Sequence, residues 1–295
     1  MLGQGDTEGV FQLESSGMKQ VLVGLQPQNL EDVIALISLY RPGPMDSIPT
    51  YLRNRHEPDK ISYKTPQLAH ILDVTNGCIV YQEQVMQIFR ELAGFSFGQA
   101  DNVRRAMSKK KHAVMEAERE HFVHGCTEPG HECPGCVANG ISEKVANEIY
   151  DEMSSFASYA FNKSHAACYA YVAFQTAYLK CHYPSEFMAA LLTSVLDNTD
   201  KVIEYSGECA RLGIKVLPPD INHSYDGFTV DGENIRFGLV AIKNIGRGFI
   251  QTLIRRRDKE GPFTSFLDFC QRMDDCTDMN KRAVENLIRS GAFDS

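Results

Sequence analysis

The segment Ser164–Cys181, with the sequence SHAACYAYVAFQTAYLKC, indicates most directly which kind of fold this chain adopts. It contains no proline or glycine, and its apolar residues lie nearly all round a helix, which is typical of a helix buried in a large helical body. On both sides of this segment, apolar residues recur at helical spacing in most of the chain. These further predicted helices cover 30–40, 80–92, 115–123, 142–156, 185–196, 200–211, 245–257, 263–273 and 280–290.

One short stretch departs from the helical pattern. Residues 228–230 and 234–237 alternate in polarity around Asp231-Gly232, which predicts a short β-hairpin. Composition also shifts after Asn198. We therefore expect a mainly α fold, in which a large helical domain is followed by a smaller domain with the hairpin, and the boundary lies near residue 200.

Composition limits the classes of function. The 295 residues carry a net charge of -8, so a nucleic-acid surface would have to be a local basic patch. No apolar run approaches the roughly 20 residues that a membrane helix needs, and the N-terminus lacks the pattern of a secretion signal. The nine cysteines are scattered, which fits a reduced cytoplasmic protein better than a disulfide scaffold. We expect a cytoplasmic protein with no membrane partner.

A basic run at Arg104–Lys111, RRAMSKKK, places five cations within eight residues and no acid among them. Arginine forks grip phosphate oxygens in pairs, whereas lysines act as point charges. The run therefore fits phosphate binding. A merely solvated charged surface is the alternative.

A second motif, Phe161–His165 (FNKSH), opens the apolar helix. Lys163 and His165 lie where backbone N–H groups favour an anion, and Tyr169 one turn later could stack on a base. From the residues alone, a helix start with solvated polar ends is the simpler interpretation. Glu83, within Tyr81–Met86 (YQEQVM), could pair with one of the arginines or be a surface acid.

The segment 241–248, AIKNIGRG, reads as a tight turn that leads into a helix. Such a turn directs backbone N–H groups outward and can hold one DNA phosphate. Asn244 takes the place of a first glycine, because asparagine tolerates the left-handed conformation. Seven cations against one acid between Arg236 and Lys259 also favour DNA contact, although such turns can serve purely as packing corners.

Four residues form a possible zinc set: Cys126, His131, Cys133 and Cys136. Their close spacing could close a tetrahedron of the kind that structural zinc requires. A surface loop with incidental thiols is the alternative. The sequence shows no Ser-His-Asp arrangement that we recognise, no phosphate-binding glycine loop of the Walker type and no Asp-x-Asp pair.

Six motifs together resemble one protein family, and they occur in the family's order. They are Val10–Ser15 (VFQLES), Arg41–Pro44 (RPGP), Tyr81–Met86 (YQEQVM), Arg104–Met107 (RRAM), Phe161–His165 (FNKSH) and Leu217–Asn222 (LPPDIN). The chain resembles the C family of bacterial replicative DNA polymerases, the alpha subunits of DNA polymerase III. The closing Gly291–Asp294 (GAFD) is similar to that family too.

The resemblance implies a domain plan and a function. Residues 1–14 would be the end of the palm or a linker, 15–198 the fingers domain, and 199–295 a helix-hairpin-helix domain. The implied function is DNA-directed DNA synthesis, with deoxynucleoside triphosphates and primer–template DNA as partners. The rest of the alpha subunit, and through it the holoenzyme with its sliding clamp, would be further partners. A stand-alone, zinc-stabilised DNA-binding module with no nucleotide role is the alternative.

The resemblance also assigns residues. The nucleotide would be held by Arg104, Arg105, Lys109, Lys163, His165 and Tyr169, with Glu83 and Arg41 as supports. DNA would be contacted by Lys110, Lys111, Lys243, Asn244, Gly246, Arg247 and Gly248. No catalytic residue is assigned, because the family's aspartates, which hold Mg²⁺, belong to the palm upstream of these motifs. The chain alone is therefore expected to be inactive.

Overall fold

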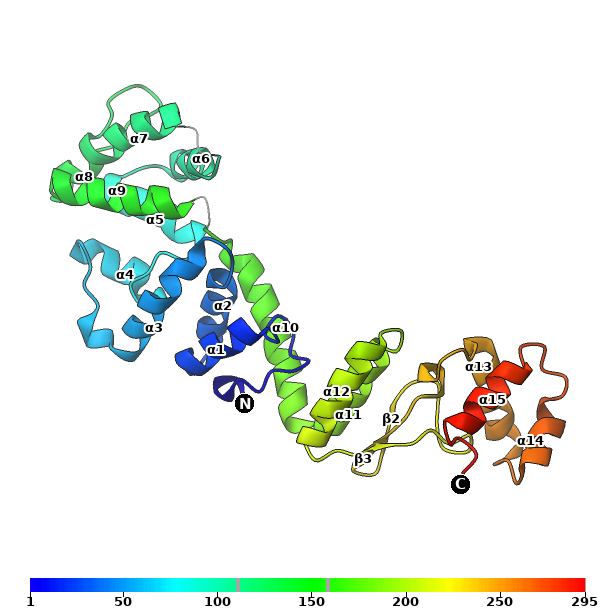
Figure 1. The fold of residues 1–295 in the computed structure, drawn as a ribbon. Coiled ribbons are helices and arrows are strands. Elements are labelled where there is room, and N and C mark those ends of the chain that lie inside the picture. The colour runs from blue at the N-terminus through cyan, green and yellow to red at the C-terminus, as the bar shows by residue number, and fades with distance from the viewer. Residues whose placement is uncertain (110–111, 158–159, 295) are drawn as a thin grey trace. The chain divides into compact units, whose positions relative to one another are not determined.

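The computed structural model describes residues 1–109, 112–157 and 160–294 (Figure 1). In these ranges there are fifteen α-helices and one three-stranded sheet, so the prediction of a mainly α fold is confirmed. The chain forms two compact units. The N-terminal unit comprises residues 1–7 and 12–174, and the C-terminal unit comprises 8–11 and 175–295. The ranges 1–14, 15–198 and 199–295 expected from the sequence stay predictions.

The N-terminal unit consists of helices joined by loops and short 3-10 turns. Its helices are α1 (Ser16–Leu25), α2 (Leu30–Leu39), α3 (Ile48–His56), α4 (Ala69–Leu72), α5 (Gln82–Ala93), α6 (Phe97–Ser108), α7 (His112–His124), α8 (Gly135–Ala138), α9 (Glu143–Ala157) and the first part of α10 (Lys163–His182). Polar side chains begin several of them, since Ser15, Asn29 and Ser96 each accept a backbone N–H of the first turn.

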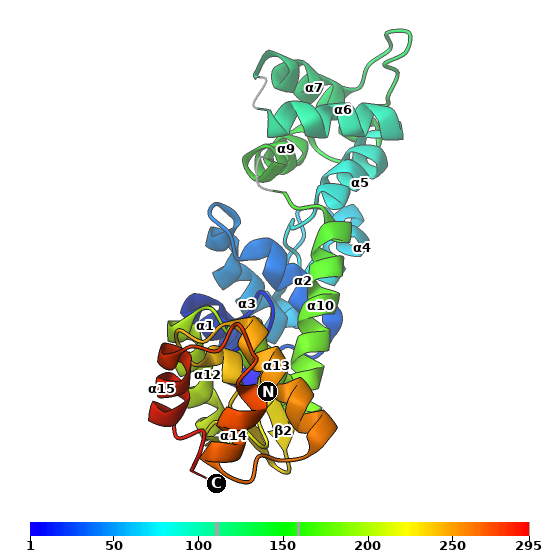
Figure 2. The same cartoon turned by 90° about the vertical axis from the view of Figure 1, so that its right-hand side faces the viewer.

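Aromatic packing holds together the part of this unit that carries the basic run. Phe89 of α5, Phe122 of α7 and Tyr150 of α9 are fully buried, with ring centroids 5.0 to 6.0 Å apart. Edge and tilted contacts at such separations stabilise a core beyond the area they bury. In two perpendicular views α6, α7 and α9 lie together (Figures 1 and 2). This core fixes the direction in which α6 presents its arginines.

Helix α10 differs from its prediction. We expected burial nearly all round, but only a narrow strip is buried in the N-terminal unit, formed by the small residues Ala166, Ala170 and Ala173. Tyr171 remains 57% exposed and Phe174 50% exposed. The apolar sequence was therefore misleading, because the fully buried positions in this part of the helix are alanines, while larger side chains such as Tyr171 and Phe174 stay about half exposed.

The C-terminal unit combines helices with the predicted hairpin. Its elements are α11 (Pro184–Ser194), α12 (Thr199–Arg211), β1 (Val216–Leu217), β2 (Thr229–Asp231), β3 (Asn234–Arg236), α13 (Arg247–Glu260), α14 (Phe266–Met273) and α15 (Lys281–Arg289). Strands β2 and β3 are antiparallel, with Asp231 opposite Asn234. Gly232 in the turn has φ +62°, which glycine adopts without strain. Strand β1 adds parallel to β3, giving the order β1-β3-β2.

A buried ion pair ties residues 8–11 into the C-terminal unit. Lys180 Nζ lies 2.6 Å from Glu208 Oε1, and the two side chains are only 1% and 4% exposed. Lys180 also donates to the carbonyl of Glu8, and Arg211 contacts the same carboxylate at 2.7 Å. Burial opposes ionisation of Glu208, but the hydrogen bonds from Arg211 and Lys180 outweigh it and lower the pKa of that carboxyl group. The carboxyl group of Glu208 is thus held in its charged form.

Within the described ranges, none of the helices is long and apolar enough to cross a lipid bilayer.

Candidate functional site

Two motifs that lie 80 residues apart in the sequence meet through their backbones in the N-terminal unit. Phe161 pairs with Tyr81 in a parallel bridge, and the backbone N–H of Gln82 donates to the Phe161 carbonyl at 2.9 Å. The side chain of Gln82 donates to the carbonyl of Ala160, also at 2.9 Å. The start of α5 therefore holds the segment that leads into α10.

A carboxylate already occupies the start of α10. Glu83 accepts the backbone N–H of Lys163 and the side-chain amide of Asn162, each at 3.1 Å. Asn162 in turn accepts the N–H of His165 at 2.9 Å. The expectation that this helix end offers open N–H groups to a phosphate is therefore not met at Lys163 and His165, because side chains accept both of these N–H groups. Lys163 instead directs its ammonium group to Glu31 at 3.0 Å.

The two arginines of α6 share one acid. Asp101 accepts from Arg104 at 2.7 Å through one oxygen and from Arg105 at 2.8 Å through the other. The hydrogen bond from Arg104 is the main cause of a lowered pKa of Asp101. Arg104 also donates to the side chain of Gln82 at 3.0 Å, whereas Arg105 is 66% exposed. One guanidinium group is thus fixed in place, and the other reaches toward solvent.

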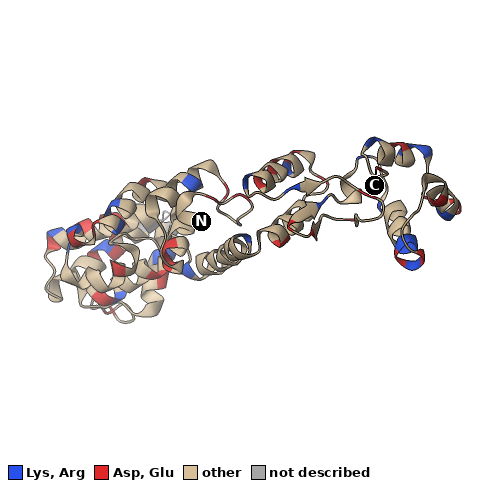
Figure 3. Ribbon diagram, turned by 90° about the horizontal axis from the view of Figure 1, so that it is seen from below, with Lys and Arg blue, Asp and Glu red and all other residues tan. Residues whose placement is uncertain are grey.

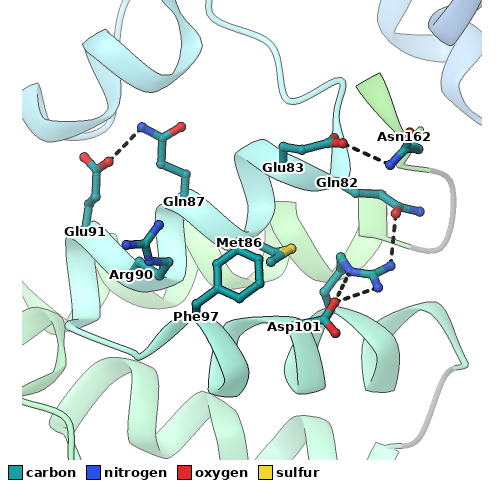
Figure 4. A pocket seen from close by; sticks show the side chains of 10 residues that line it. Gln82, Glu83, Met86, Gln87, Arg90, Glu91, Phe97, Asp101 and Asn162 are labelled. Atoms are coloured by element: carbon teal, nitrogen blue, oxygen red, sulfur yellow. Dashed lines mark hydrogen bonds and ion pairs between the residues drawn. The ribbon is translucent and has the colours of Figure 1, made fainter. Parts of the chain in front are cut away.

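A cavity of about 480 Å³ lies beside Arg104, between α5 and α6. Figure 4 shows Met86 and Phe97 between the two helices, with polar side chains on both sides. Gln82 and Asp101 stand at one end, and Gln87 is hydrogen-bonded to Glu91 at the other. An apolar floor with a charged rim suits a ligand that has both a flat apolar part and an anionic part.

A second cavity, of about 400 Å³, collects other predicted residues. Phe161, just before α10, and His165 and Tyr169 on α10 follow one another at a spacing of four residues, with successive ring centroids 5.3 and 4.4 Å apart. The guanidinium carbon of Arg41 lies 4.0 Å from the Phe161 ring centroid, and burial lowers the pKa of Arg41. This column offers a stacking surface next to a cation.

The structure thus divides the predicted nucleotide residues between neighbouring places in one unit. Arg104 and Glu83 line the first cavity, while Arg41, His165 and Tyr169 line the second. Lys109 is exposed at the end of α6, and Lys110 and Lys111 lie outside the described residues. Sequence reasoning missed Gln82 and Asp101. Asp101 could have been found, because it stands three and four residues before the two arginines, at the helical spacing of an ion pair.

The predicted DNA-binding turn precedes α13. Asn244 has φ 61°, the left-handed conformation predicted for it. Gly246 is the N-cap residue of α13, and among the described residues no side chain makes a capping hydrogen bond at that helix start. Arg282 of α15 donates to the Asn244 side chain at 2.9 Å, a contact that the sequence did not indicate. Lys243, Arg247 and Gly248 are exposed in the same turn.

The positive charge around this turn is smaller than the sequence count suggested. Arg236 pairs with Asp231 at 2.7 Å, and Arg256 pairs with Asp275 at 2.5 Å. Arg257 is buried and donates to two backbone carbonyls. Basic and acidic residues are interspersed along the helices (Figure 3). Several of the seven cations are therefore structural.

The residues proposed for zinc do not converge. Cys126 and Cys133 face each other across an antiparallel bridge, but His131 is exposed in the loop between them. Cys136 is fully buried in the core, where burial raises the pKa of its thiol to about 12. In the described part of the chain, no group of three or more His, Cys, Asp or Glu residues is placed to hold a metal ion. The set does not fit zinc.

Comparison with known proteins identifies the family. Residues 1–130 match the bacterial DNA polymerase III alpha subunit finger domain, and residues 213–295 match a helix-hairpin-helix motif. Over its whole length the chain is 48% identical to the DNA polymerase III alpha subunit of Thermus aquaticus and 45% identical to that of Bacillus subtilis. The chain belongs to the bacterial DNA polymerase III alpha-subunit family.

The chain corresponds to only a part of each of these relatives. The chain spans about a quarter of their length: 24% of the Thermus aquaticus subunit and 25% of the subunits from Bacillus subtilis and Pasteurella multocida, the last of which is 46% identical. The finger-domain match includes α5 and α6 with the arginine pair, and the helix-hairpin-helix match includes the turn at Asn244.

Proposed function

We propose that this chain positions the incoming deoxynucleoside triphosphate and contacts primer–template DNA within a replicative DNA polymerase. The observation that carries the proposal is the arginine pair of α6: Asp101 contacts both guanidinium groups, and Gln82 fixes Arg104 beside the segment that opens α10. Guanidinium groups held in place bind phosphate oxygens without losing side-chain freedom on binding. The proposal places the protein in the bacterial cytoplasm and makes the holoenzyme with its sliding clamp its wider partner.

In this proposal Arg104 and Arg105 bind the triphosphate, with Lys109 and Lys163 nearby as point charges. The guanidinium of Arg105 is the first to meet the ligand because it is the more exposed of the pair. The column of Phe161, His165 and Tyr169 offers the nucleotide a stacking face. Glu83 and Arg41 act as supports, the first by holding the start of α10 and the second by covering the Phe161 ring.

DNA contact is assigned to the C-terminal turn. Lys243, Asn244, Gly246, Arg247 and Gly248 would hold one backbone phosphate, with the positive end of the α13 dipole behind it. Lys110 and Lys111 belong to the same proposal from the sequence alone. These contacts orient the duplex and carry no sequence information, as a replicative enzyme requires.

The chemistry served is transfer of a deoxynucleotide to a primer end with release of pyrophosphate. Mg²⁺ supplies activation of the primer hydroxyl and charge neutralisation in such transfers, and we assign no ligand for it to this chain. The residues here contribute positioning and electrostatic stabilisation of the triphosphate. The alternative of a zinc-stabilised module has no supporting cluster among the described residues.

The decisive experiment is nucleotide kinetics of the full-length polymerase that contains this chain. Arg104→Ala and Arg105→Ala should each raise the apparent KM for nucleotide about tenfold to a hundredfold, because a hydrogen bond to a charged group contributes about 1.5–3 kcal/mol. Arg53→Ala, an exposed arginine of α3, is the matched control and should leave KM unchanged. Unchanged KM in both α6 variants would contradict the site assignment.

A further inference from the structure

Two cysteines stand directly opposite each other in the hairpin that joins α7 to α8. The backbone N–H of Cys126 donates to the carbonyl of Cys133, and the N–H of Cys133 donates back to Cys126, both at 2.9 Å. Residues paired in this way on antiparallel strands have Cα atoms about 5.5 Å apart and side chains on the same face. Disulfides bridge Cα separations of about 4.4 to 6.8 Å. Neither cysteine is in a disulfide here, and the Cys133 thiol donates a hydrogen bond to the carbonyl of His121 at 3.6 Å.

The backbone around the pair fixes this register. Gly125 and Gly135 flank the two cysteines, and both have positive φ. A Cβ atom on Gly125 would lie 2.6 Å from the carbonyl oxygen of Cys133, and one on Gly135 would lie 2.3 Å from the nitrogen of Gly125. Residues larger than glycine are excluded at both places, so the two arms of the hairpin approach closely and keep the cysteines opposite each other.

Access favours Cys126 as the first thiol to react. Cys126 is half-buried, whereas Cys133 is 8% exposed and Cys136 is fully buried. The six residues between the pair, 127–132, are all exposed, so the loop can adjust without disturbing the core. Cys136 is the nearest competitor for Cys133 in the sequence, but it packs in the core beneath the hairpin.

We propose that Cys126 and Cys133 are a reversible redox pair that forms a disulfide by exchange with a low-molecular-weight disulfide such as oxidised glutathione. The thiolate of Cys126 attacks one sulfur of the reagent, whose S–S bond breaks and releases one glutathione thiol. Cys133 then attacks Cys126 in the mixed disulfide, forms the intramolecular bond and releases the second glutathione. The two protein thiols lose two electrons and two protons, and one reagent disulfide becomes two thiols.

The same geometry makes the bond easy to reduce. Cβ atoms of a hydrogen-bonded pair are about 5.5 Å apart, whereas a relaxed disulfide requires about 3.5 to 4.5 Å. The hairpin must therefore tighten when the bond forms, and strained disulfides have more oxidising potentials than structural ones. The pair thus suits a response to changing redox conditions, which is the use that disulfides have in reducing compartments. This inference does not depend on the proposed function.

The test uses the whole 295-residue chain in buffers of oxidised and reduced glutathione, followed by alkylation of the remaining thiols. Cleavage after Glu132 separates Cys126 from Cys133 and Cys136, so a disulfide to Cys126 keeps the two fragments joined until reductant is added. We expect joined fragments in the wild type and in Cys136→Ser. The link should be lost in Cys133→Ser, and Cys168→Ser, an exposed cysteine on α10, should behave as the wild type.

Two results would overturn the proposal. One is a link that persists in Cys133→Ser, which would place the bond at Cys136. The other is glutathione retained on Cys126 of the wild type without any joined fragments. Circular dichroism of each serine variant in reducing buffer establishes that the helices are intact, so that a missing link reports thiol chemistry and not unfolding.

Discussion

A single carboxylate decides how the two arginines of α6 are presented. The run 104–111 contains no acid, and the sequence therefore suggested five mutually repelling cations. Asp101 lies one turn earlier and bridges Arg104 and Arg105, which removes part of that repulsion and orders one guanidinium group. Counting charges within a motif misses partners one helical turn away, and these partners set the geometry.

Lys180 and Glu208 carry a stability prediction at the same scale. Lys180→Ala leaves Glu208 buried with Arg211 as its remaining partner. We expect the free energy of unfolding to fall by about 3 kcal/mol at pH 7, because the buried carboxylate loses its buried partner and keeps only the half-exposed Arg211. Urea denaturation measures this. Lys201→Ala, an exposed pair with Glu204 on α12, should change stability by less than about 0.5 kcal/mol.

The pH dependence of this effect follows from the lowered pKa of Glu208. A carboxyl group whose pKa is lower in the folded state stabilises the fold above its unfolded pKa of about 4.3, and this contribution is lost as the pH falls through the folded value. The difference between wild type and Lys180→Ala should therefore shrink below about pH 4. A difference that stays constant into acid would contradict the role given to this pair.

At the scale of elements, local patterns predicted more than long-range ones. Helical spacing located α2, α5, α9 and α12, and Asp231-Gly232 located the hairpin of β2 and β3. The pairing of Tyr81 with Phe161 has no local signal, because the two residues are 80 positions apart. The prediction that α10 is buried nearly all round was wrong for a related reason. Which face of a helix packs depends on neighbouring elements, and the sequence of the helix alone does not show where these lie. Resemblance supplied the candidate residues, but not Gln82, Asp101 or Arg282.

The turn before α13 can be tested for duplex binding through Arg282. Arg282→Ala removes the donor to the Asn244 side chain and one cation beside the turn. We expect weaker duplex binding by the 295-residue chain and a log K against log salt slope shallower by about 0.9, the value for one phosphate contact. Arg289→Ala, at the other end of α15, is the matched control. Equal losses in both variants would indicate a diffuse charge effect and not a site at the turn.

At the scale of the whole molecule, substrate positioning and bond making are separable tasks. The chain spans about a quarter of its relatives and carries the arginine pair and the helix-hairpin-helix match, while its sequence has no Asp-x-Asp pair for catalytic metals. Positioning groups alone do not activate a primer hydroxyl, because that step would need metal ions and acidic residues to hold them. We therefore expect the isolated chain to bind duplex DNA but to extend no primer. Denaturing gels of a labelled primer, incubated with all four nucleotides and Mg²⁺, measure this. Extension above a protein-free blank that disappears in Arg104→Ala would contradict it, since the site proposed for positioning would then belong to a complete active centre.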